Sequence, residues 1–180
     1  AAELYQERFP NDKVIVADAH QYLLDHYKEF DFIWSSPPCP SHSRVRISQK
    51  SRDSFKAVYP DMKLWQEIFF LQHHAPGMYL VENVIPYYDN PIPAQKIGRH
   101  LYWTNLNLIG IIPRKVKIGA GTDEVKKLCE FHDFDFYKYK GEQRRDKMAR
   151  NLVDYEVGKQ ILEIAVGKFK QDNQKQGLLF

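Results

Sequence analysis

The chain has 180 residues and a mass of 21.3 kDa, which is enough for one domain and leaves little room for a second. Hydrophobic residues make up 43% and charged residues 27% of it, which excludes collagen-like, coiled-coil and disordered chains. The net charge of +3 is small, but the charge is unevenly distributed along the chain.

Two segments are strongly basic. Residues 42–56 hold five Lys and Arg against one Asp, and residues 138–150 hold six against two acidic residues, so the rest of the chain is acidic. Basic segments on an acidic body indicate a polyanionic partner such as nucleic acid. Two solvated loops would explain the charge equally well.

The sequence also gives expectations about membrane insertion, disulfide bonds and metal binding. No run of the sequence reaches the roughly 20 apolar residues of a membrane helix, so we expect no membrane partner. The two cysteines, Cys39 and Cys129, are too few for a disulfide scaffold and too far apart to indicate a zinc site. We therefore expect a cytoplasmic protein without a metal.

In chain order, residues 1–9 have the pattern of the end of an amphipathic helix, and we expect further residues upstream of Ala1. Three short apolar runs then have the pattern of strands buried in a parallel sheet: residues 14–17, 31–34 and 78–81. Helical patterns separate these runs, and this alternation predicts an α/β fold.

The second half of the chain is less regular. Residues 101–103 and 106–112 are expected to be strands, an antiparallel pair at the sheet edge, and residues 154–166 an amphipathic helix. Residues 119–141 have no clear period.

A polar residue follows each of the three predicted buried strands. Asp18, Cys39 and Glu82 each stand at the carboxyl end of a strand, where ligands bind in α/β sheets. Cys39 lies in Pro37-Pro38-Cys39-Pro40, whose prolines restrict the backbone and so orient the thiol. Nearby arginines would favour the nucleophilic thiolate, although an inert buried cysteine is the better reading of this motif alone.

Glu82 directly follows three apolar strand residues. A carboxylate is costly to bury there unless it has a partner or a task, and the alternative is a side chain that faces solvent at the sheet end. Asp18 has the same ambiguity.

Taken together, these motifs resemble those of the C5-cytosine DNA methyltransferases. Residues 31–43, Asp-Phe-Ile-Trp-Ser-Ser-Pro-Pro-Cys-Pro-Ser-His-Ser, are similar to the family's Pro-Cys nucleophile motif, and Val-Glu-Asn-Val at 81–84 to its Glu-Asn-Val motif. Residues 97–105 are similar to its arginine-bearing strand, and residues 148–153 to its closing cofactor motif.

The resemblance implies methyl transfer from S-adenosylmethionine to C5 of a cytosine flipped out of double-stranded DNA. It assigns Cys39 as the nucleophile at C6, Glu82 as the acid facing N3 and Arg99 as the contact to O2. Since the family usually has Arg-x-Arg where this chain has Arg99-His100, His100 takes the place of the functional arginine in one alignment.

The resemblance also assigns the binding residues. The implied cofactor residues are Asp18, Ala19, Pro38 and Asn151. The implied DNA-binding residues lie in the loop that corresponds to the family's mobile catalytic loop: Ser41, Ser43, Arg44, Arg46, Lys50 and Arg52.

The implied fold is α/β, a Rossmann-like S-adenosylmethionine-dependent methyltransferase fold that is incomplete at its N-terminal strands. The family's Phe-x-Gly-x-Gly cofactor loop does not occur in this chain, so an upstream segment or a second chain would supply it. The implied domains are a partial catalytic core (1–105), a minimal target-recognition region (106–147) and a C-terminal helix that completes the core (148–180).

Three alternatives stay open. The chain is a catalytically silent relative that binds DNA or stabilises a partner, or it methylates cytosine in RNA, as one branch of the family does. The third, methylation of an exocyclic amine, is disfavoured because Cys39 stands where that motif has an aromatic ring.

Overall fold

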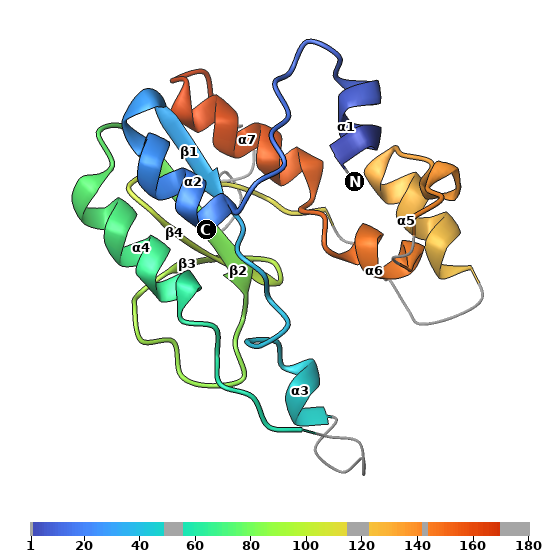
Figure 1. The fold of residues 1–180 in the computed structure, drawn as a ribbon, viewed down its shortest axis with the longest axis horizontal. Helices are drawn as coiled ribbons and strands as arrows, with labels where there is room; N and C mark the ends of the chain where they lie inside the picture. Colours follow the sequence, from blue (N-terminus) through green and yellow to red (C-terminus); the bar gives the residue numbers. More distant parts are fainter. Residues whose placement is uncertain (1, 49–55, 115–122, 142–143, 170–180) are drawn as a thin grey trace, which may run out of the picture. The chain divides into compact units, whose positions relative to one another are not determined.

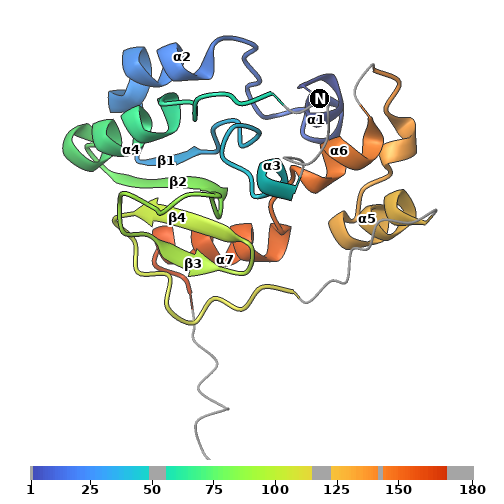
Figure 2. The ribbon, with the colours of Figure 1, turned by 90° about the horizontal axis from the view of Figure 1, so that it is seen from below.

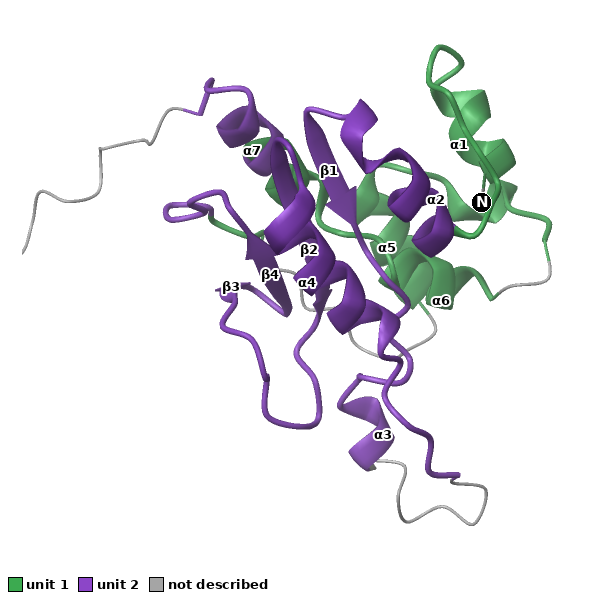
Figure 3. Ribbon diagram, turned by 60° about the vertical axis from the view of Figure 1, so that its left-hand side comes forward, with its two compact units in different colours: residues 1–18, 112–160 green, residues 19–111, 161–180 purple. Residues whose placement is uncertain are grey.

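The computed structural model describes residues 2–48, 56–114, 123–141 and 144–169. The chain divides into two compact units (Figure 3): residues 1–18 with 112–160 form unit 1, and residues 19–111 with 161–180 form unit 2. These boundaries differ from the implied segments 1–105, 106–147 and 148–180, whose roles stay predictions.

Unit 2 contains a four-stranded mixed sheet with the order β1-β2-β4-β3 (Figure 1). Its strands are β1 (Phe32–Ser35), β2 (Met78–Val84), β3 (Gln95–Ile97) and β4 (His100–Thr104). β1 and β2 are parallel, and β4 runs antiparallel to both β2 and β3. The structure is thus mixed α/β, which confirms the predicted fold class at this level.

Two helices, α2 (Ala19–His26) and α4 (Lys63–His74), lie on one side of this sheet (Figure 2). Leu64, Ile68 and Leu71 of α4 recur with helical spacing and are at most 2% exposed. They pack with alternate residues of the strands, among them Val81 and Trp103, in one apolar cluster. The remaining helices of unit 2 are η1 (Tyr27–Glu29), α3 (Val45–Ser48) and the last residues of α7 (Tyr155–Ala165).

Gly77 fixes the start of β2 against β1. A Cβ atom at this position would lie 2.4 Å from the Asp31 carbonyl oxygen, so only glycine allows this approach. The same carbonyl accepts a hydrogen bond of 2.9 Å from the Met78 backbone nitrogen. The parallel register of β1 and β2 begins at this contact.

Unit 1 is helical and contains α1 (Ala2–Arg8), α5 (Glu124–His132), η2 (Phe136–Lys138), α6 (Arg145–Arg150) and the first part of α7. Leu128, Phe136 and Ala149 form its small core. Arg150 donates to both carboxylate oxygens of Glu124, at 2.5 and 2.6 Å, and joins α6 to α5.

Two predicted strands are wrong. Residues 14–17 have no regular structure, and Val16 is 85% exposed, because an apolar run forms a strand only where a neighbouring strand pairs with it. Residues 106–112 are also irregular: the Gln95 side chain donates to the Leu106 carbonyl (2.7 Å) and accepts from the Leu108 nitrogen (2.9 Å). Side-chain hydrogen bonds take the place of a strand ladder there.

Other predicted elements are confirmed. Residues 31–34 and 78–81 fall on β1 and β2, residues 101–103 lie in β4, and α7 lies within the predicted helix 154–166. Within the described ranges, no helix is long and apolar enough to cross a membrane.

Candidate active site

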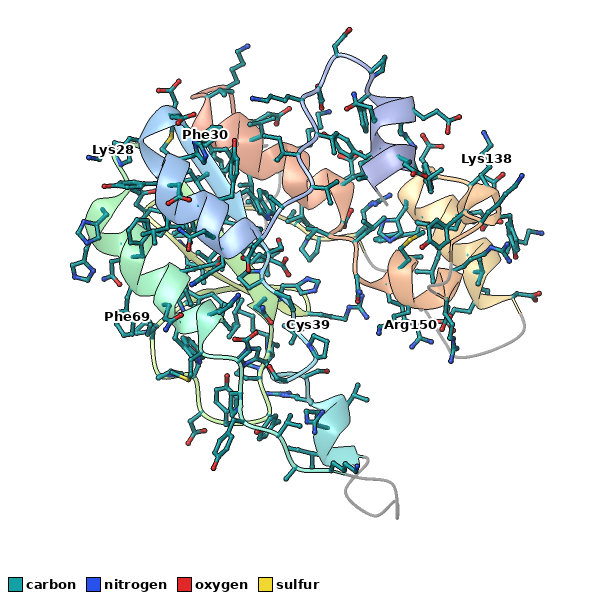
Figure 4. The ribbon with its side chains drawn as sticks, viewed as in Figure 1. Lys28, Phe30, Cys39, Phe69, Lys138 and Arg150 are labelled. Atoms are coloured by element: carbon teal, nitrogen blue, oxygen red, sulfur yellow. The ribbon has the colours of Figure 1, made fainter. Side chains whose placement is uncertain are left out.

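The Cys39 turn, residues 36–40, leaves the sheet beside Glu82. Ser35, the last residue of β1, pairs with Val81 of the parallel strand β2, and Glu82 is the next residue of β2. Figure 4 shows Cys39 near the carboxyl end of β2. The two strongest sequence motifs therefore meet at one edge of the sheet, as the parallel strands predicted.

Two hydrogen bonds fasten the Cys39 turn to β2. The Ser36 hydroxyl donates to Glu82 Oε2 at 2.9 Å, and Asn83 Nδ2 donates to the Pro37 carbonyl at 2.9 Å. Glu82 is 7% and Asn83 2% exposed, so each bond has one buried partner. Residues 46 positions apart in the sequence thus hold the turn in one place.

The downstream side of the turn is also anchored. The Cys39 carbonyl accepts hydrogen bonds from the backbone nitrogens of His42 (3.0 Å) and Ser43 (3.1 Å). His42 is fully buried, and its Nδ1 is hydrogen-bonded to the Tyr88 hydroxyl at 2.5 Å. Cys39 itself is partly exposed and forms no disulfide.

Burial makes Glu82 a weaker acid than an exposed glutamate. Loss of hydration raises the pKa of its carboxyl to about 7, against the opposing effect of the Ser36 hydrogen bond. His100 Nε2 lies 3.5 Å from Glu82 Oε1, and burial together with the Arg99 guanidinium lowers the pKa of His100 to about 4. At neutral pH the imidazole is therefore uncharged, and the contact is not an ion pair. Glu82 can hold and release a proton near pH 7, as a general acid must.

The structure brings His100, rather than Arg99, to Glu82. Gly98, with φ of 58°, forms the turn between β3 and β4, and Arg99 is exposed in this turn. His100 begins β4 opposite Val84, while Glu82 faces Tyr102, so His100 and Glu82 share a face of the sheet. The role of Arg99 at O2 stays a prediction.

The predicted cofactor residues are divided between the units. Pro38 lies in the Cys39 turn and Ala19 begins α2, both in unit 2. Asp18 and Asn151 belong to unit 1, where Asn151 follows the last residue of α6 and has helical backbone angles. Unit 2 by itself contains only Ala19 and Pro38 of this set.

The predicted DNA-binding residues lie in a loop that carries α3 and extends beyond the carboxyl ends of β1 and β2 (Figures 1 and 3). The hydroxyls of Ser41 and Ser43 accept backbone hydrogen bonds of 3.0 and 3.3 Å, which makes them part of the loop fold. Arg44 donates to the Pro86 carbonyl (3.3 Å), and Arg46 donates to the Lys56 carbonyl (2.6 Å). Lys50 and Arg52 lie outside the described residues.

A second buried carboxylate, which the sequence did not predict, binds Ser35, the last residue of β1 before the Cys39 turn. Glu67 of α4 is 6% exposed, accepts from the Ser35 hydroxyl, and is hydrogen-bonded to His20 Nδ1 at 2.9 Å. Ser35 and Ser36 thus bind carboxylates on opposite faces of the sheet. The available signal was an acidic residue three positions after Leu64, on the apolar face of a helical pattern.

Comparison with models of protein families, with curated proteins and with solved structures gives no match. Among the residues that the structure describes, no group of three or more His, Cys, Asp or Glu side chains could hold a metal ion.

Proposed function

We propose that this chain is the catalytic part of a DNA (cytosine-5)-methyltransferase. The observation that carries the proposal is the pair of hydrogen bonds, Ser36 to Glu82 and Asn83 to Pro37, that fastens the turn with the partly exposed Cys39 to the strand with the buried Glu82 carboxyl group. This chemistry needs a nucleophilic thiol and a proton donor at one site, and both motifs contribute to it.

The pKa of Glu82 supports its role as the acid. Cytosine N3 must be protonated as a nucleophile adds at C6, and a carboxyl with a pKa of about 7 is half protonated at neutral pH. In the addition, the Cys39 thiolate sulfur forms a bond to C6, the C5–C6 π pair shifts to a C4–C5 double bond, the C4–N3 π pair moves onto N3, and N3 takes the Glu82 proton. The ring becomes nucleophilic at C5. Loss of the C5 proton and departure of Sγ later restore the aromatic ring.

His100 faces the second oxygen of Glu82 and stays neutral there. In our proposal His100 occupies the position that the resemblance gives to an arginine. Because it is neutral, it leaves the Glu82 carboxyl able to hold a proton. A permanent cation 3.5 Å away would favour the ionised form and lower the pKa of this acid.

The methyl donor of the proposed reaction is S-adenosylmethionine, and the residues of unit 2 do not form a complete site for it. Ala19 and Pro38 have no polar side-chain atoms with which to hold a cofactor. The addition of Cys39 and its reversal need only the residues of unit 2. An upstream segment or a second chain would supply the remaining cofactor contacts, and the proposed fold is a Rossmann-like methyltransferase that lacks its N-terminal strands.

The substrate is double-stranded DNA from which the target cytosine flips out, because neither C5 nor C6 is accessible to a thiol in a stacked duplex. Arg44 and Arg46 lie in the loop beyond the Cys39 turn, where closure over the DNA would bring them to phosphates.

One observation favours a second candidate, a catalytically silent relative that binds DNA. The incomplete set of cofactor residues in unit 2 is expected for such a protein. The buried Glu82 argues against it, because a silent protein gains nothing from a carboxyl whose ionisation is costly.

Covalent trapping tests the proposal. The protein is incubated with S-adenosylmethionine and duplex DNA that contains 5-fluorocytosine, and the adduct is measured by intact mass. Fluorine cannot leave as a proton does, so a methylating enzyme stays attached to the base. With the upstream segment or second chain that completes the cofactor site present, an adduct in the wild type and none in Cys39→Ala is expected. An equal adduct in both proteins would remove Cys39 from the mechanism.

A further inference from the structure

Unit 1 contains a polar cavity of about 380 Å³ that the proposed reaction does not use. Its walls come from α5, from the segment that follows η2 and from the start of α6. The volume lies within the range of small-molecule sites and is too small for a protein segment or a duplex.

The side chains that line the cavity have a net positive charge, which can bind an anionic ligand. Arg144 donates to both oxygens of Asp146, at 3.0 and 2.8 Å, so this acid is already neutralised. Lys140 and Arg145 also line the cavity, and within the described part of the chain neither has a carboxylate at ion-pair distance. Arg145 Nε and Nη2 donate to the Tyr139 carbonyl at 3.3 Å, and the Nη1 donors remain for a ligand.

Two tyrosine rings border the same cavity. Tyr137 is 55% exposed, and the Arg145 guanidinium lies 5.8 Å from the centre of its ring. Tyr139 folds back over Gly141, where a Cβ atom would lie 2.2 Å from the Tyr139 hydroxyl oxygen. Glycine at 141 therefore allows this position of the ring. Exposed rings beside guanidinium groups provide stacking surfaces for unpaired bases.

We propose that this cavity is a nucleotide pocket: it binds one nucleotide of a single nucleic-acid strand, with the phosphate on Lys140 and Arg145 and the unstacked base against Tyr137. A nucleotide uses both features of the cavity. A simple anion would need the two cations but not the exposed ring, and an apolar ligand would need the ring but not the cations. The pocket does not depend on the methyl transfer, because all its residues belong to unit 1.

Fluorescence anisotropy with a labelled oligothymidine of about ten nucleotides tests the pocket, with the full chain at several salt concentrations. Lys140→Gln combined with Arg145→Gln is expected to weaken binding at least about ten-fold and to reduce the salt slope by about 0.7, the value for the one phosphate that both side chains contact. Lys126→Gln combined with Lys127→Gln removes the same charge from an exposed part of α5 and should have a smaller effect. Equal losses in the two double variants would overturn the proposal.

The base contact has its own test. Tyr137→Leu should weaken binding about ten-fold with an unchanged salt slope, and Tyr137→Phe should bind like the wild type. An abasic strand of the same length that binds as well as oligothymidine would refute the base contact, and competition by inorganic phosphate at equal concentration would reduce the pocket to an anion site.

This test is separate from that of the methyltransferase. Cys39→Ala should bind oligothymidine normally, so a failure of covalent trapping with intact binding overturns only the proposed function. Duplex DNA that binds to the pocket as tightly as the single strand, with the same loss in Tyr137→Leu, would refute the requirement for an unpaired nucleotide.

Discussion

Replacement of Glu82 by glutamine should stabilise the protein at alkaline pH relative to the wild type, although it slows the proposed reaction. Glu82 is 7% exposed, and its pKa rises from 4.5 to about 7 on folding. Between these values the folded chain keeps a proton that the unfolded chain has lost, so stability falls as the pH rises. A pKa shift of this size corresponds to a loss of about 3 kcal/mol in the free energy of unfolding as Glu82 ionises. Glutamine cannot ionise, so the variant does not lose this stability.

The neighbouring histidine hides this effect in the wild type. The pKa of His100 falls from 6.5 to about 4 on folding, so His100 makes the protein more stable as the pH rises through that window. The two contributions have opposite signs over nearly the same range and largely cancel. The difference between Glu82→Gln and the wild type isolates the carboxyl group.

Urea unfolding at pH 5 and pH 8 measures this difference. We expect the free energy of unfolding of Glu82→Gln, relative to that of the wild type, to be about 2–3 kcal/mol higher at pH 8 than at pH 5. The hydrogen bond from Ser36 can be kept, since the amide oxygen accepts as the carboxyl oxygen does. Glu7→Gln, at an exposed position of α1, is the control and should show no such trend. The same stability difference at both pH values would refute a buried Glu82 with a raised pKa.

The remaining predictions concern catalysis, the turn and the loop. Glu82→Gln should slow methylation roughly 100-fold, measured by methyl incorporation into DNA, and an undiminished rate would exclude Glu82 as the acid. Cys39→Ser should abolish turnover with an unchanged urea midpoint; retained methylation would contradict covalent catalysis. Asn83→Ala removes a buried amide and leaves the Pro37 carbonyl without its donor, which should cost about 1–3 kcal/mol in urea unfolding; a cost near zero would show that this hydrogen bond does not stabilise the turn. Arg44→Gln with Arg46→Gln should reduce the salt slope of duplex binding by about two, and an unchanged slope would leave this loop without a DNA role.

The sequence was sufficient for the two parallel strands that carry the site, but not for β3, which pairs with β4 in place of the expected strand 106–112. The apolar runs at 31–34 and 78–81 are short and continuous, which is the pattern of buried parallel strands, and they form β1 and β2. Since parallel strands end at one edge, the meeting of Cys39 and Glu82 could also be predicted. The run at 14–17 has the same pattern and forms no strand, because local composition does not reveal whether a pairing partner exists.

The fine structure of the site could not be predicted. The partners of Ser35 and Ser36 lie 32 and 46 positions away in the sequence, and nothing local identifies a hydrogen bond over that distance. The choice between Arg99 and His100 depends on where β4 begins, since a shift of one residue moves a side chain to the other face of the strand.

The most direct test of the account is hydrogen exchange at C5 of cytosine without any cofactor. Addition of Cys39 to C6 makes C5 basic enough to exchange its proton with water, and this step needs only the residues of unit 2. With DNA that carries tritium at cytosine C5, we predict tritium release into water by the wild type and none by Cys39→Ala. No release from the wild type, with the DNA bound and the protein folded, would contradict the assignment of Cys39 and Glu82 as a cytosine-activating pair.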